Sequence, residues 1–255
     1  MPNLRASALG ILCLTAVGLA QAQPKPPVKP DGEFRAVLGI GASLSTGNSE
    51  GGNLSITADG VRATSRSKTS VFGNAQYARA DGTTTAERLR LGGRQDQDFG
   101  ETVFGFGGAE VERNRFANLR LRTLLSGGVG IHQLKTPLHS VDLFGGLGHT
   151  GDRYFSPTLI DGATRDRYGY LSLLLGAEST HKLSETTSAK QKFVLLPNLR
   201  HSGQYRATWD AGLSVSMTRL LALTVGLSVA HNSEPGPGRK STDALRTSGV
   251  SLKFD

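Results

Sequence analysis

The feature that most constrains the fold of this chain is an alternation of apolar and small residues at a period of two. From Leu221 to Ala230, every odd-numbered residue is leucine or valine, and every even-numbered residue is alanine, threonine, glycine or serine. This pattern is typical of a β-strand whose two faces meet different environments. The same period returns at the end of the chain and places an aromatic residue, Phe254, in the last strand. A strand that closes the chain on an aromatic residue favours a β-barrel.

The first residues of the chain have the pattern of a secretory signal peptide. Arg5 precedes an uncharged apolar run, and Ala20-Gln21-Ala22 fits the small-x-small pattern of a cleavage site. The run of about 15 residues is shorter than the roughly 20 that a membrane-spanning helix needs. We therefore expect export from the cytoplasm. The expected organisation is a signal peptide at residues 1–22, a proline-rich periplasmic leader at residues 23–33 and one outer-membrane β-barrel domain at residues 34–255.

The composition agrees with an exported all-β protein. The only cysteine, Cys13, lies inside the apolar run, so the exported chain has no thiol for a disulfide, a metal site or a nucleophile. The 33 glycines are scattered through apolar segments, which excludes a collagen-like repeat. The formal net charge of +8 would suit nucleic acid, but export makes that partner improbable. Lipopolysaccharide phosphates and small anionic solutes are the expected partners instead.

Alternating segments recur along the chain and predict an antiparallel transmembrane β-barrel of about twelve strands. An even number of strands leaves both termini on the periplasmic side of the outer membrane. The odd-numbered connections then face outward, and they include the longest expected loop, Asp152 to Thr164, and the Gly/Pro-rich segment Asn232 to Lys240. Between residues 102 and 112 the faces stay unassigned, because a bulge at Gly107-Gly108 is one interpretation of the pattern.

The charged residues inside the predicted strands are the candidate lining of the barrel lumen. An arginine or lysine on the lipid face at mid-membrane costs roughly 2 to 4 kcal/mol, so we expect these cations to point inward. Aspartates in the inward phase are their candidate partners. Ion pairs can fill a lumen or line a pore, and the sequence leaves both open. The candidate lumen-lining residues are Asp59, Arg88, Arg90, Arg94, Arg120, Arg122, Asp142, Lys190, Lys192 and Asp210.

Several motifs together resemble the family of salt-induced outer-membrane proteins, a domain of unknown function (family 481). They are the Leu44–Ser49 loop, Glu112–Phe116 running into Leu119–Arg122, Trp209-Asp210, and Asn232–Gly238 followed by Thr242-Asp243. The resemblance covers nearly the whole mature chain and implies an outer-membrane barrel without an established activity. Two positions depart from the family pattern, because Asn114 stands where an aspartate is expected and Asp255 follows the final aromatic residue.

The family-like loop motifs have two interpretations. Asn, Gly and Pro set the geometry of turns, which is the structural interpretation, and the alternative is contact with a ligand or partner. The residues concerned are Thr46, Gly47, Asn48, Asn232, Ser233, Pro235, Pro237, Gly238 and Asp243.

No pattern in the sequence predicts catalysis, a cofactor or a metal site. A hydrolase needs a serine, a histidine and an orienting group together, and no serine stands in a recognisable nucleophile context. No two histidines stand at ligand spacing within one strand or loop. The histidines are scattered, most of them at expected strand ends or turns, at His132, His139, His149, His181, His201 and His231.

The sequence therefore predicts an outer-membrane β-barrel that is not an enzyme and acts as a small passive pore with a weak preference for anions. The first alternative is a closed barrel with a structural or envelope-stress role, whose outer loops bind lipopolysaccharide or a protein. The second is a barrel enzyme that modifies lipids. The expected partners are outer-membrane lipids, lipopolysaccharide, the outer-membrane assembly machinery during biogenesis and small anionic solutes, with no nucleic acid.

Overall fold

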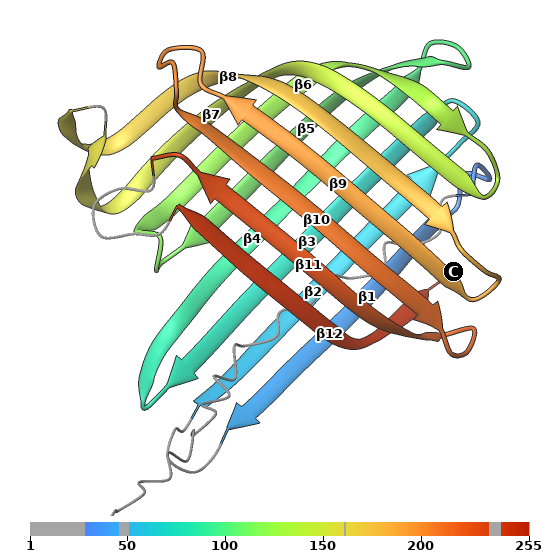
Figure 1. The fold of residues 1–255 in the computed structure, drawn as a ribbon, viewed down its shortest axis with the longest axis horizontal. Coiled ribbons are helices and arrows are strands. Elements are labelled where there is room, and N and C mark those ends of the chain that lie inside the picture. Colours follow the sequence, from blue (N-terminus) through green and yellow to red (C-terminus); the bar gives the residue numbers. More distant parts are fainter. Residues whose placement is uncertain (1–28, 46–50, 161, 235–240, 255) are drawn as a thin grey trace, which may run out of the picture.

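The computed structural model describes residues 29–45, 51–160, 162–234 and 241–254, which form one closed antiparallel β-barrel (Figure 1). Each strand pairs with its neighbours in sequence, and β1 pairs with β12 to close the barrel. The all-β class and the expected strand number are confirmed. The strands are β1 (Phe34–Ser45), β2 (Gly51–Ala63), β3 (Ser67–Ala80), β4 (Thr83–Asp98), β5 (Val103–Asn114), β6 (Leu119–Lys135), β7 (His139–Ile160), β8 (Ala163–Lys182), β9 (Thr187–Pro197), β10 (Tyr205–Ser216), β11 (Leu221–Asn232) and β12 (Thr242–Phe254).

The two ends of the barrel differ in their connections. At one end, called the terminus end, β1 begins and β12 finishes, with Ala36 opposite Phe254. At the other, called the loop end, each odd-numbered strand turns into the next even-numbered one. The expected signal peptide and most of the leader lie outside the described residues. No helix among the described residues is long and apolar enough to cross a membrane.

The prediction of a long loop at residues 152–164 is wrong. The two longest strands, β7 and β8, continue through it to Ile160 and from Ala163, and their hairpin reaches the left edge of the view in Figure 1. This segment is rich in charged residues and lacks the apolar alternation of the membrane strands. A hairpin with both faces in water needs no apolar face, so the period-two signal fades while the strand continues.

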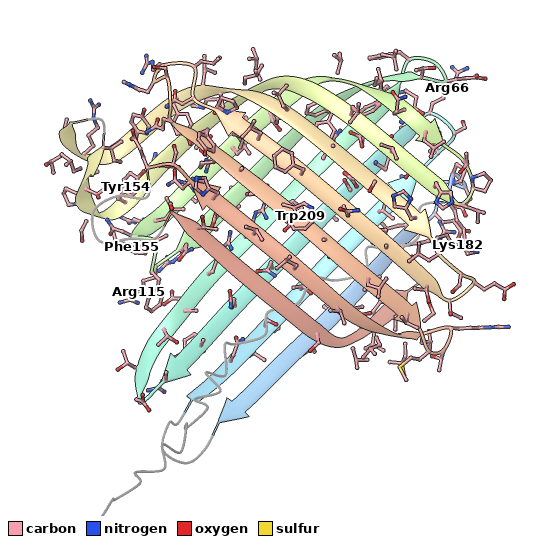
Figure 2. The ribbon with its side chains drawn as sticks, viewed as in Figure 1. Arg66, Arg115, Tyr154, Phe155, Lys182 and Trp209 are labelled. Carbon is pink, nitrogen blue, oxygen red and sulfur yellow. The ribbon has the colours of Figure 1, made fainter. Side chains whose placement is uncertain are left out.

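The outer wall of the barrel is apolar. Leu125, Val129 and Leu147 are 60%, 61% and 54% exposed, although large apolar side chains are normally inside a protein. They alternate along their strands with small or partly buried residues. Trp209 on β10, labelled in Figure 2, is also exposed. Other exposed residues of the same wall are Leu89, Leu91, Leu143, Leu171, Leu173, Leu213, Leu223, Val225, Val250 and Leu252. This is the surface that a membrane-spanning barrel presents to lipid.

At three places inside the barrel, a phenylalanine ring lies over the glycine that is paired with it on the neighbouring strand. Phe144 on β7 is paired with Gly176 on β8, and a Cβ atom added at Gly176 would overlap the ring. The same relation holds for Phe104 with Gly130 and for Phe72 with Gly92. The glycines therefore leave the space that the rings occupy over the adjacent strand, as in aromatic rescue of a glycine.

The bulge considered for Gly107-Gly108 does not occur. The pairing of β5 with β6 continues without interruption from Val103 to Glu112, and the register shifts only beyond Glu112. A Cβ atom at Gly108 would lie 3.1 Å from a carbonyl oxygen of β4, so the glycine permits close strand approach instead of an extra residue. The faces are thereby assigned. Phe104 and Glu112 point inward, and Val103 points outward.

Candidate functional site

The interior of the barrel carries ion pairs between β4 and β5. Arg90 Nε and Nη2 donate to the carboxylate of Glu110 at 2.6 and 2.7 Å. Arg88 Nε donates to Glu112 Oε1 at 2.9 Å. Both arginines lie in the inward phase of β4, opposite to the exposed leucines of that strand. Two predicted lumen cations are thus neutralised by glutamates of the next strand.

An apolar cluster occupies the inner wall beside these pairs. Phe106 and Phe144 meet edge to face with ring centroids 5.5 Å apart. The guanidinium of Arg94 lies over both rings, at 4.2 and 4.4 Å from their centroids, and donates to Asp96 at 2.6 Å. Cation–π contact and ion pairing together hold this arginine inside the barrel. The cluster consists of Phe104, Phe106, Phe144, Leu174 and Leu196, with Leu124 and Val194 packed against it.

A third ion pair lies nearer the loop end. Arg122 Nε and Nη2 donate to Asp152 at 2.7 and 2.6 Å, and the Tyr154 hydroxyl donates to the same carboxylate at 3.1 Å. The Asp152 side chain is 3% exposed. A buried carboxylate that accepts three hydrogen bonds is a fixed part of the interior, so this pair is structural.

Arg206 on β10 differs from the other inward arginines. Its Nη2 donates to Thr150 Oγ1 at 3.2 Å, and its guanidinium lies 5.8 Å from the centroid of the Tyr170 ring. Among the described residues, no carboxylate lies within 4.0 Å of it. Its Nε is buried without a hydrogen-bond partner in that part of the chain. Among the interior cations that the structure describes, Arg206 therefore has the most capacity left for an anion.

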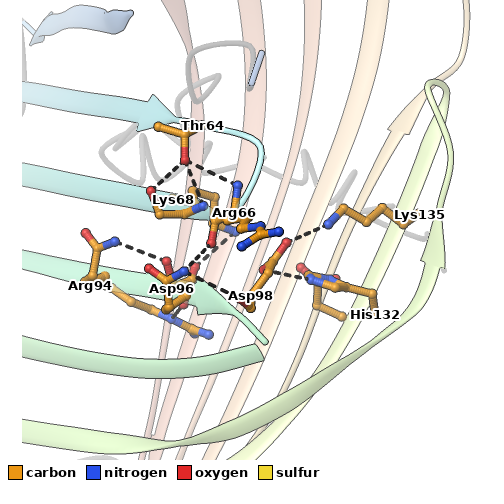
Figure 3. Close-up of polar contacts among 12 residues, drawn as sticks. Thr64, Arg66, Lys68, Arg94, Asp96, Asp98, His132 and Lys135 are labelled. Carbon is orange, nitrogen blue, oxygen red and sulfur yellow. Dashed lines mark hydrogen bonds and ion pairs between the residues drawn. The ribbon is translucent and has the colours of Figure 1, made fainter. Parts of the chain in front are cut away.

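A polar cluster occupies the terminus end (Figure 3). His132 lies between two carboxylates, with Nδ1 at 2.7 Å from Asp142 and Nε2 at 3.2 Å from Asp98. Lys135 Nζ donates to Asp98 at 2.8 Å. The imidazole also stacks on Phe104 at a centroid distance of 4.8 Å. The Lys68 ammonium and the Arg94 guanidinium both contact Asp96 in the same view.

The opposite inner wall has small side chains. On β10 and β11 the inward positions include the directly paired Gly212 and Gly226, and Ser214 paired with Thr224. Thr224 is also paired with Gly249 on β12. Charged and aromatic side chains therefore gather on the inner face of β4 to β8, whereas serine, threonine and glycine predominate on β10 and β11.

The structure places most of the predicted lumen residues on the inner wall, with partners that differ from those expected. Asp142 binds His132, and Asp210 accepts a hydrogen bond from Ser228 at 2.5 Å. Lys192 lies 3.8 Å from Glu178. Lys190 and Asp59 are not free either, because each has a polar or electrostatic interaction within the protein. The predicted pairing of arginines with Asp142 and Asp210 does not occur as a direct ion pair among the described residues.

Arg120 is the predicted lumen residue that leaves the inward phase. The pairing of β6 shifts at this point with both neighbours, so one extra residue lies between Leu119 and Arg122. Leu119 is buried at 2% exposure, while Arg120 is exposed. A bulge inverts the alternation on one side of itself, and a strict period-two pattern cannot reveal it.

The sequence interpretation missed Glu110, Glu112 and Asp152, which neutralise the arginines, and it did not single out Arg206. The signal for Arg206 was available, because it shares its phase with Asp210 in β10. The sequence alone could not show that Glu110 and Glu112 point inward, because a bulge at Gly107-Gly108 would have turned them to the other face. Asp152 was assigned to a loop.

The loop motifs can be followed at two positions. Asn232 Nδ2 donates to the carbonyl of Glu234, and the Glu234 amide donates to Asn232 Oδ1. The Tyr205 amide donates to Ser233 Oγ. These contacts have the turn-forming character of the structural interpretation. The motif residues Thr46, Gly47, Asn48, Pro235, Pro237 and Gly238 lie outside the described residues, as does the side chain of Asp243.

Two histidines that are distant in sequence lie together at the terminus end. His139 and His181 face each other across β7 and β8 with their Nδ1 atoms 3.1 Å apart. Within the described residues, no group of three or more His, Cys, Asp and Glu side chains is arranged to hold a metal ion.

Comparison with known proteins gives one family and several barrels of similar fold. The family model described as "Protein of unknown function, DUF481" matches residues 38–254. No curated protein matches the chain in sequence. The translocator domain of autotransporter NalP from Neisseria meningitidis is 14% identical, with a TM-score of 0.47, over 87% of this chain and 88% of that chain. A NanC porin is 10% identical, with a TM-score of 0.46, over 86% and 97%. These similarities concern the fold alone.

Proposed function

The chain belongs to the DUF481 family, and we propose that this member is a narrow passive pore of the bacterial outer membrane with a weak preference for small anions. The apolar outer wall supports the membrane location, because a continuous exposed apolar surface of this kind requires lipid or a partner. The outer membrane is proposed over other membranes because the sequence predicts an export signal and the fold is an antiparallel barrel with an even number of strands.

The observation that carries the pore proposal is the unequal filling of the interior. Large side chains lie along the inner face of β4 to β8, while the paired Gly212 and Gly226 and their serine and threonine neighbours line β10 and β11. A barrel of twelve strands is wider than the eight-stranded barrels that side chains alone can fill. A path for small solutes would run along the wall of small side chains.

The anion preference is proposed to be weak because most interior cations are already paired. Arg88, Arg90 and Arg122 each bind a carboxylate and leave little field for a passing solute. Arg206 is the exception, and it lies near the loop end of the wall of small side chains. Basic residues in a pore lining favour anions.

The test is single-channel current through refolded residues 23–255 in a planar bilayer with a salt gradient. We expect discrete steps and a reversal potential that indicates a modest excess of anion permeability. Arg206→Gln is expected to lower the anion-to-cation permeability ratio. Arg219→Gln, at an exposed turn of the terminus end, is the matched control and is expected to leave the ratio unchanged. A folded barrel that carries no current contradicts the pore.

A closed barrel is the second candidate, and the apolar cluster favours it. Phe106 and Phe144, with Arg94 stacked on both rings, are held in place by packing and an ion pair. If this cluster seals the lumen, the wild-type barrel carries no current while Phe106→Ala conducts. A structural or envelope-stress role would then replace the pore. No catalytic role is proposed; lipid turnover by the purified barrel that is lost in a serine or histidine variant would overturn this view.

The orientation is proposed to place the loop end outside the cell. The exported chain has no native cysteine, so single introduced thiols can be labelled without background. Ser156→Cys at the loop end is expected to react with a membrane-impermeant maleimide on intact cells. Glu185→Cys, at an exposed turn of the terminus end, is expected to react only after permeabilisation. The reverse result would invert the barrel.

A further inference from the structure

A row of arginines crosses the outside of the barrel at the loop end. Arg153 on β7 is directly paired with Arg167 on β8, and Leu121 on β6 is paired with Arg153. On β5, Arg113 lies between the pairs Glu112–Arg122 and Asn114–Leu119, which places it opposite the bulge that contains Arg120. Four neighbouring strands thus each contribute one arginine at the same level. The row consists of Arg113, Arg120, Arg153 and Arg167, all of them exposed.

The row lies on the outer wall, directly beyond the apolar band. Arg113 is two residues from the outward Val111, and Arg167 is four residues from the outward Leu171, which is 49% exposed. In a strand, residues separated by an even number of positions share a face. The four arginines line a groove of about 610 Å³ together with Leu89 and Val111 of the apolar wall and with two acidic residues, Glu112 and Asp166. One groove therefore joins a cationic edge to a lipid-facing surface.

The positive charge of this row is incompletely balanced. Arg113 lies 3.8 Å from Glu87, and Arg167 lies 3.9 Å from Asp166. In the part of the chain that the structure describes, Arg120 and Arg153 have no carboxylate within 4.0 Å. Like charges directly opposite each other on neighbouring strands are destabilising, as with Arg153 and Arg167. An anion bound between them would remove that repulsion.

We infer that this groove binds the phosphorylated head group of lipid A, the membrane anchor of lipopolysaccharide, while its acyl chains lie along the adjacent leucines and valines. The inference rests on the proposed placement in the outer membrane with the loop end outside. Arginine suits phosphate because its planar guanidinium donates two parallel hydrogen bonds. Free phosphate would need only the arginines, whereas the groove continues onto apolar side chains, as a lipid with an anionic head requires.

The inference is tested by titrating the refolded mature chain in detergent with bisphosphorylated lipid A and measuring binding by native mass spectrometry. The double variant Arg153→Gln/Arg167→Gln is expected to weaken binding roughly tenfold or more, since it removes charge-assisted hydrogen bonds to phosphate. Arg165→Gln also removes a positive charge from β8, but Arg165 lies outside the groove lining, so this variant is expected to stay within about twofold of wild type. Heat-modifiable gel mobility checks that each variant is folded.

Three outcomes would overturn the inference. Lipid A without its phosphates that binds as tightly as the bisphosphorylated form would show that the arginines do not recognise phosphate. Equal weakening by Arg165→Gln would indicate diffuse attraction instead of a groove. Inorganic pyrophosphate that competes as well as lipid A would make a free anion the ligand. The pore proposal is tested separately, because its current is measured in a phospholipid bilayer without lipid A.

Discussion

Arg90 on β4 and Glu110 on β5 form a two-pronged ion pair inside the barrel, with guanidinium nitrogens 2.6 and 2.7 Å from the carboxylate oxygens. The two residues are separated by two pairing positions along the sheet, because Gly92 stands directly opposite Glu110. The long arginine side chain reaches diagonally along the inner wall to make the contact. Pairing of this kind neutralises a lumen cation within the sheet itself.

Glu110→Gln is expected to destabilise the barrel by roughly 1 to 3 kcal/mol, because Arg90 keeps its charge and loses its counter-charge. Urea unfolding in lipid vesicles, followed by tryptophan fluorescence of Trp209, measures this loss. The double variant Arg90→Gln/Glu110→Gln is expected to be less destabilised than the sum of the two single variants. Strict additivity would show that the pair contributes no coupling energy.

Gly176→Ala is expected to destabilise the barrel by about 1 to 3 kcal/mol, because the new Cβ atom would overlap the Phe144 ring. The ring cannot retreat freely, since it packs against Phe106 and under Arg94. Gly107→Ala is the matched control, because no atom lies within 4 Å of a Cβ built there. The two variants are compared in the same unfolding assay. Equal loss in both would refute the steric role of the phenylalanine–glycine pairing.

Asn118 holds the extended β7–β8 hairpin against the turn that joins β5 to β6. Its Nδ2 donates to the Ser156 carbonyl at 2.7 Å, and its Oδ1 accepts from the Ser156 amide at 3.0 Å. Its φ of 56° is in the left-handed region, which asparagine tolerates better than most residues.

Asn118→Ala is expected to free the hairpin, because the side-chain hydrogen bonds are lost and alanine is strained at this φ by about 1 kcal/mol. Limited trypsin digestion of the folded barrel should then cut faster at Arg153, Arg165 and Arg167. Asn118→Gly keeps the backbone conformation and removes only the hydrogen bonds. Protection equal to wild type in Asn118→Gly would show that the backbone conformation, and not the side chain, secures the hairpin.

The barrel architecture could be predicted from the sequence because membrane strands must alternate between lipid and lumen. Leu221 to Ala230 shows this alternation, since its odd residues include the exposed Leu223 and Val225, and its even residues include the buried Ala222 and Thr224. The period-two pattern failed as a guide where strands are not required to alternate regularly between the two faces of the barrel. The hairpin around residue 160 has water on both faces, and the bulge at Arg120 changes the phase within a strand.

The site was less predictable than the fold because pairing depends on register between strands. Phase alone placed Arg88 and Arg90 inward, but their partners Glu110 and Glu112 are set by the alignment of β4 with β5. The arginine row on the outer wall likewise needs the registers of four strands. In the sequence, Arg153 and Arg167 are each an ordinary charged residue near an expected turn, and nothing indicates that they lie opposite each other.

Asp31 in the leader, outside the strands of the barrel, forms an ion pair at the terminus end with Arg35, the second residue of β1. Arg35 Nη1 donates to Asp31 Oδ1 at 2.8 Å, and the Glu33 amide donates to the same oxygen at 3.1 Å. The hydrogen bonds from the Arg35 guanidinium, followed by that of the Glu33 amide, lower the pKa of the Asp31 carboxyl below its ordinary value. The folded pKa is lower than the unfolded one. The contact therefore stabilises the fold above the ordinary aspartate pKa of about 4 and is lost as pH falls through the folded value.

Carbon-detected NMR of the Asp31 carboxyl in the refolded barrel is expected to give a titration midpoint well below the ordinary aspartate value. Arg35→Gln removes the guanidinium while leaving the backbone amide of Glu33 in place, so the midpoint should move back most of the way toward that value. A wild-type midpoint at the ordinary value would show that the ion pair does not form in solution. A midpoint that stays low in Arg35→Gln would assign the shift to the backbone hydrogen bond instead.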